Sequence, residues 1–77
     1  MAIYKVHIKT EGNKTVYTIY TTVFASIIYR ADLGKYEVET EKSKLTADTA
    51  DEADRMARES ITAFLANLGV VPNFINE

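Results

Sequence analysis

The sequence predicts an α+β fold, an antiparallel β meander of four or five strands with one C-terminal helix packed on one face. Apolar and polar residues alternate through the first part of the chain, as in half-buried strands. Turn signals separate the alternating runs, two of them containing glycine. After residue 50 apolar residues recur at helical spacing as far as Gly69.

The first strand is expected over residues 3–10, where Tyr4, Val6 and Ile8 alternate with polar residues. A two-residue loop, Gly12-Asn13, follows with glycine first, as a type II′ turn requires. This loop sets Ile8 opposite Tyr17, so that apolar residues meet on one face. A slip of one residue would break the match, which makes this register the favoured one.

The second strand is expected over residues 15–31, TVYTIYTTVFASIIYRA, a run without charge before Arg30 and without Gly, Pro, Asn or Asp. Because no residue signals a turn inside the run, we expect one long strand, or two nearly collinear ones, bent by a β-bulge between Thr21 and Ala25. A helix over residues 22–30 is the alternative, which β-branched and aromatic residues disfavour.

Two further strands complete the predicted meander, over residues 35–41 and 44–47. A turn centred on residues 33–34 precedes the first of them and sets Tyr29 opposite Val38. A turn at residues 42–43 joins the two. All the predicted turns bring the same set of side chains to one face, and this agreement supports the meander.

The helix is expected over residues 50–68, and Thr49 with Glu52 forms a capping box at its start. Its alanines predict a close approach of the helix to the sheet. The tail, residues 70–77, is still apolar, so we expect it to pack back on the domain or to dock on a partner. The predicted buried stripe of the helix is Ala50, Ala53, Ala57, Ile61, Phe64, Leu65 and Leu68.

Length and composition restrict the class of protein. The 77 residues make one domain, and the absence of cysteine excludes disulfides and thiolate–zinc sites. A net charge of −2 is too mild for a polyanion mimic or a nonspecific nucleic-acid binder. The sequence has neither a signal-peptide pattern nor an apolar stretch of spanning length, so we expect a cytoplasmic protein away from membranes.

Catalytic chemistry finds little support in the sequence. The one histidine, His7, sits between two lysines on a polar strand face, where a solvated side chain is the expected state. No serine has a His/Asp set around it, and no glycine-rich phosphate loop is present. Glu37, Glu39 and Glu41 share a strand face, which favours a solvated edge over a metal site. We expect no catalytic residue, metal or cofactor.

The sheet face opposite the helix is the predicted partner site, since one helix covers only one face. An apolar stripe with charged flanks marks a protein interface, and a homodimer is one way to cover it. The alternative is that the bend turns Phe24 and Ile28 into the core. The predicted stripe is Val16, Tyr20, Phe24 and Ile28, with Lys5, His7 and Lys9 at one end and Glu37 and Glu39 at the other.

A small nucleic-acid-binding domain is the alternative function. Lys5, His7 and Lys9, with Lys14 and Tyr20 nearby, form a basic patch with an aromatic. Phosphate contacts would make such binding depend steeply on salt concentration, which an apolar interface would not.

The order strand–strand–strand–helix over residues 23–68, with a helix that begins TADEA, resembles the HicB-like antitoxin domain. This resemblance implies a protein that neutralises a small toxin by binding it. The chain lacks that family's small-residue motif before the helix and its DNA-binding extension. Its size and acidity are also similar to phage-encoded inhibitors such as anti-CRISPR proteins. Both resemblances imply an inhibitor or modulator, and neither carries a functional residue over.

Overall fold

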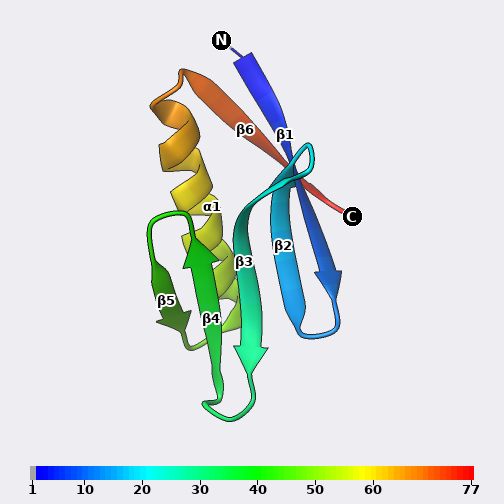
Figure 1. The fold of residues 1–77 in the computed structure, drawn as a ribbon, viewed down its shortest axis with the longest axis vertical. Coiled ribbons are helices and arrows are strands. Elements are labelled where there is room, and N and C mark those ends of the chain that lie inside the picture. Colours follow the sequence, from blue (N-terminus) through cyan, green and yellow to red (C-terminus); the bar gives the residue numbers. More distant parts are fainter. Residues whose placement is uncertain (1) are drawn as a thin grey trace.

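The computed structural model describes residues 2–77 as one six-stranded sheet with a helix packed on it (Figure 1). The strand order across the sheet is β5-β4-β3-β2-β1-β6, antiparallel except for the parallel pair β1–β6. The predicted α+β class is confirmed, and the extra strand makes the sheet mixed. The strands are β1 (Ala2–Glu11), β2 (Lys14–Ile19), β3 (Thr22–Arg30), β4 (Lys35–Thr40), β5 (Lys44–Ala47) and β6 (Val70–Asn76).

The tail packs back on the sheet as edge strand β6, beside β1. The backbone N–H of Glu77 donates to the carbonyl of Ile8 at 2.9 Å, which fixes the even-numbered residues of β1 as those whose backbone groups face β6. By the same alternation the nitrogen of Pro72 lies on the free edge of β6. Its missing N–H therefore costs no ladder bond and blunts the edge.

The first hairpin has the predicted register, with Ile8 opposite Tyr17 and the loop at Gly12 and Asn13. Gly12 has φ 60°, and Asn13 is not among the residues with positive φ. Positive φ at the first central residue alone is the pattern of a type II′ turn, as predicted.

The predicted long strand over residues 15–31 is wrong, because the run forms a second hairpin. β2 ends at Ile19, β3 begins at Thr22, and the two strands are antiparallel. Tyr20 and Thr21 make the turn between them, with φ 54° at Tyr20. The prediction failed because it required a glycine, asparagine or aspartate at a position where tyrosine adopts the left-handed conformation. The helical alternative is wrong for the same segment.

A β-bulge lies where the sequence predicted one, but within this hairpin. Tyr17 opposes Ala25 and Thr18 opposes Val23, so that Phe24 is the extra residue on β3. The bulge changes which side chains of β3 face the core, and Phe24 packs against it.

The last two hairpins are shifted by two residues from the predicted registers. Tyr29 opposes Tyr36 rather than Val38, because the loop occupies residues 31–34 with Gly34 at φ 65°. In the next hairpin Val38 opposes Leu45. Side chains alternate with a period of two, so a shift of two residues leaves every one of them on its predicted face.

The helix α1 (Ala50–Ala66) covers one face of the sheet, here called the inner face, and the opposite face is called the outer face. The predicted cap is confirmed, since the hydroxyl of Thr49 accepts from the N–H of Glu52 at 3.1 Å. The predicted stripe extends too far, because Leu68 lies beyond the helix and is 62% exposed. The core contains Val6, Ile8, Tyr17, Ile19, Ala25, Ile27, Val38, Ala47, Ala53, Ala57, Ile61, Leu65 and Val70.

α1 packs on β3, β4 and β6, and in Figure 1 it lies behind β4. Ala53 and Ala57 are fully buried, as expected of small residues that let a helix approach a sheet. Within residues 2–77 no helix has the length and apolar character needed to cross a membrane.

Candidate functional site

The outer face has no helix over it, and two of the four predicted stripe residues lie there. Val16 opposes Ser26 and Ile28 opposes Lys14 on the paired strands β2 and β3. Both Val16 and Ile28 are half-buried. They therefore contribute a shallow and incomplete apolar surface.

The predicted charged flanks lie on opposite sides of this surface, on β1 and on β4. Glu37 is bound between two cations, with Arg30 and Lys44 each at 3.3 Å from its carboxylate. The flanking Glu39 is exposed on the same strand. This chain's own side chains thus neutralise Glu37, whereas Glu39 forms no ion pair within residues 2–77.

The basic flank on β1 is also partly neutralised. Nζ of Lys9 lies 3.1 Å from a carboxylate oxygen of Glu11. Nδ1 of His7 lies 3.2 Å from Oε2 of Glu77 but without the geometry of a hydrogen bond. Lys5 is the one of the three that has no acidic side chain within ion-pair distance in the described chain.

Phe24 interrupts the predicted stripe, because the bulge places it on the inner face. Its ring lies 5.5 Å from the ring of Phe64 on α1. The alternative prediction, that the bend buries Phe24 and Ile28, is correct for Phe24 and wrong for Ile28. An interface cannot run along the four stripe residues as expected.

Tyr20 has the most exposed large apolar side chain in the described chain, at 83%. It occupies the tip of the β2–β3 turn with φ 54°. Its ring meets that of Tyr4 edge to face, with 6.4 Å between centroids. This member of the predicted stripe is thus presented by a turn and not by a strand face.

Exposed apolar side chains lie at this end of the sheet, and we call this surface the apolar end. It consists of Ile3, Tyr4, Tyr20 and Val71, which are 67%, 38%, 83% and 41% exposed. Ile3 and Val71 are opposite each other on β1 and β6. In Figure 1 these strand ends reach beyond the β2–β3 turn, so β2 does not extend beside them.

Sequence reasoning placed Tyr4 on the buried face and did not select Ile3 or Val71. Tyr4 does share a face with Val6, which is fully buried, but it lies past the end of β2. Nothing in the sequence could have shown this, because the second predicted strand, over residues 15–31, ran past the position opposite Tyr4.

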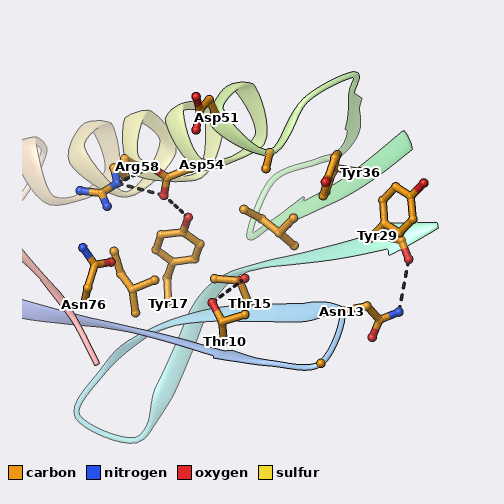
Figure 2. Close-up of a pocket in the computed structure, with 14 residues that line it drawn as sticks. Thr10, Asn13, Thr15, Tyr17, Tyr29, Tyr36, Asp51, Asp54, Arg58 and Asn76 are labelled. Atoms are coloured by element: carbon orange, nitrogen blue, oxygen red, sulfur yellow. Dashed lines mark hydrogen bonds and ion pairs between the residues drawn. The ribbon is translucent and has the colours of Figure 1, made fainter. Parts of the chain in front are cut away.

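A second candidate is the groove between α1 and the β1–β2 hairpin, about 700 Å³ in volume (Figure 2). Tyr17 stands across it, rising from the sheet to Asp54 on α1. The N–H at Nε of Arg58 also donates to Asp54, shared between its two carboxylate oxygens at 2.9 and 3.0 Å. The guanidinium of Arg58 in turn lies 4.9 Å from the centre of the Phe74 ring.

Some polar groups of this groove are hydrogen-bonded within the groove. The hydroxyls of Thr10 and Thr15 are 3.0 Å apart, and the amide of Asn13 donates to the carbonyl of Tyr29. Burial, and then the hydrogen bond to Asp54, raise the pKa of Tyr17 well above its usual range. A phenol held neutral and a carboxylate already bound to Arg58 form no activated acid–base pair, so the groove stabilises the fold.

Comparisons with known protein families, with characterised proteins and with solved structures found no match to this chain.

Proposed function

We propose that this protein is a non-catalytic interaction protein that binds a protein partner through its apolar end. The observation that supports this most is Tyr20, which is 83% exposed at the tip of a turn with φ 54°. A bulky residue at positive φ is an outlier, and L-residues lose roughly 1–2 kcal/mol there.

The structure shows no stabilising contact that would compensate the fold for the strain at Tyr20. Glycine at this position would adopt the same φ without a Cβ penalty, and the ring remains 83% exposed beside the ring of Tyr4. Backbone strain in proteins is concentrated at sites of function, where an unusual conformation presents a side chain. We therefore attribute the strain to the presentation of the ring to a partner.

The surroundings of Tyr20 have the composition of an interface. Tyrosine is enriched among the residues that dominate binding energy. Ile3 and Val71 add exposed apolar area, and Lys5 and His7 line the adjoining hollow as a polar rim. An inhibitor or modulator, of the antitoxin or phage anti-defence type that the resemblances imply, would act by occupying the partner's surface in this way.

Affinity capture from lysate with matched variants tests the proposal. Tyr20→Gly should remove the anchor without strain, and the captured partner should be lost while the circular dichroism spectrum is unchanged. Leu33→Gly is the control, because Leu33 is also exposed, at 53%, in the β3–β4 loop, and has no positive φ. A partner that both variants retain would contradict the proposal.

Two other kinds of partner, a second copy of this chain and a nucleic acid, can be distinguished by further measurements. If the partner is a second copy, sedimentation of the pure protein should show a dimer that Tyr20→Gly dissociates. Nucleic acid on Lys5, His7 and Lys9 is the weaker alternative, since carboxylates lie beside two of these residues. Its sign would be binding of an oligonucleotide that weakens steeply between 50 and 200 mM salt.

A further inference from the structure

The two edges of β1 are paired over different lengths. β6 accompanies β1 from Ala2 to Ile8, whereas β2 accompanies it only from His7 to Glu11. β2 ends early because the chain turns away at Tyr20. The edge of β1 over residues 2–6 therefore has no strand beside it where β2 would otherwise continue.

The backbone groups on this open edge belong to Ile3 and Lys5. The bond from Glu77 to Ile8 shows that even-numbered residues of β1 face β6, so the odd-numbered ones face the side of β2. His7, the next odd residue, has Thr18 beside it. Within residues 2–77 the turn makes no backbone hydrogen bond to Ile3 or Lys5, which leaves their N–H and C=O groups free.

A hollow of about 350 Å³ lies along this edge. Ile3, Lys5 and His7 line it from the outer face of β1, and Tyr4, Ile19 and Tyr20 line the rest. The hollow thus joins free backbone groups to the two exposed tyrosine rings.

We propose that this open edge of β1 receives an extended segment of the partner as an added strand, in the sheet position that β2 vacates; this inference rests on the proposed function of the apolar end. Main-chain bonds to Ile3 and Lys5 would supply affinity, and alternate side chains of the segment would supply specificity. The segment carries apolar residues toward Tyr4 and Tyr20, alternating with acidic residues toward Lys5.

Charge and edge geometry select this occupant. Lys5 has no acidic neighbour of its own within ion-pair distance in the described chain, so an acidic side chain complements it. The other open edges suit a strand less well. Pro72 removes a donor from the free edge of β6, and β5 has only four residues.

Selection from a phage library of random linear heptapeptides on the immobilised full chain tests the inference. Enriched peptides should alternate apolar with acidic residues. Ile3→Pro removes one of the two N–H groups that face the open edge and spares the β6 ladder, which uses Tyr4. This substitution should lower the affinity for a selected peptide at least about fivefold, as the loss of one hydrogen bond would. Thr46→Pro, on the free edge of β5, is the matched control and should leave binding unchanged.

Two further readouts make the outcome decisive. Binding should slow amide exchange at Ile3 and Lys5, and Lys5→Glu, which leaves the backbone intact, should weaken glutamate-containing peptides. A peptide or a captured partner lost with Tyr20→Gly but retained by both Ile3→Pro and Lys5→Glu would overturn strand addition and leave the proposed function standing. A library that yields no alternating peptide would also overturn it.

Discussion

The hydroxyl of Tyr17 donates a hydrogen bond to the carboxylate of Asp54, and so connects the centre of the sheet to the second turn of α1. Tyr17 is fully buried. Its phenol reaches the end of the core at the point where Arg58 also binds Asp54. The carboxylate of Asp54 therefore bonds both to Tyr17 on β2 and to Arg58 within α1. Removing the bond to Tyr17 tests how strongly it holds the helix to the sheet.

Tyr17→Phe removes this bond and little else, because the ring stays in place. We expect the free energy of unfolding at pH 7 to fall by about 2 kcal/mol, the usual value for a hydrogen bond to a charged group. Urea denaturation measures it. An unchanged midpoint would show that Arg58 alone satisfies Asp54.

The same substitution has a pH signature. The pKa of Tyr17 is raised in the folded state, by burial first and by Asp54 second, above its unfolded value near 10. The neutral phenol thus stabilises the fold fully below pH 10, and this contribution declines as pH rises further, since only the unfolded chain releases the proton. Between pH 10 and 11.5 the parent should lose stability faster than Tyr17→Phe. Parallel curves would contradict the assignment.

The sequence was a better guide to faces than to registers. The side-chain alternation placed Ile27, Tyr29 and Val38 correctly, although two hairpins are shifted by two residues. Alternation has a period of two and cannot detect such a shift. The length of the loop decides the register, and the residues before β4 did not indicate whether that loop has two or four residues.

The second hairpin was missed for another reason. Tyr20 adopts a positive φ without being one of the residue types that announce such a turn. Once the turn was missed, the bulge could not be given its correct effect, and Phe24 was assigned to the outer face. The candidate site was predictable only as far as Tyr20, Lys5 and His7, because the unpaired end of β1 depends on where β2 stops.

Tyr20→Gly should stabilise the protein. Glycine relieves the positive φ at Tyr20, although it also gives the unfolded chain more freedom, so we expect a net gain of roughly 1 kcal/mol. For a domain of this size the melting temperature should rise by about 4–8 °C. Leu33→Gly, at a residue without positive φ, should lower it. A destabilised Tyr20→Gly would mean that the ring supports the fold after all.

Adjacent residues on the bulged strand provide a test of the corrected faces. Phe24 packs against Phe64 in the inner layer, whereas Val23 is 53% exposed. Phe24→Ala should cost about 2 kcal/mol, less than a fully buried phenylalanine, and Val23→Ala should change stability by no more than about 0.5 kcal/mol. Thermal melts of the two variants measure both effects. If both substitutions changed stability equally and only slightly, Phe24 would have to lie on the surface.

Amide exchange in the free protein tests the open edge before any partner is known. Tyr4 and Val6 direct their N–H groups to β6, while Ile3 and Lys5 direct theirs to the side that β2 leaves vacant. Protection should therefore alternate along this part of β1. We expect exchange at Tyr4 and Val6 to be at least about tenfold slower than at their odd-numbered neighbours, because a bonded amide must open first. Fraying of the strand end would speed exchange at all four amides together and would not produce alternation. Uniform protection would show that the turn at Tyr20 already covers the edge, and strand addition would then have no free backbone groups to use.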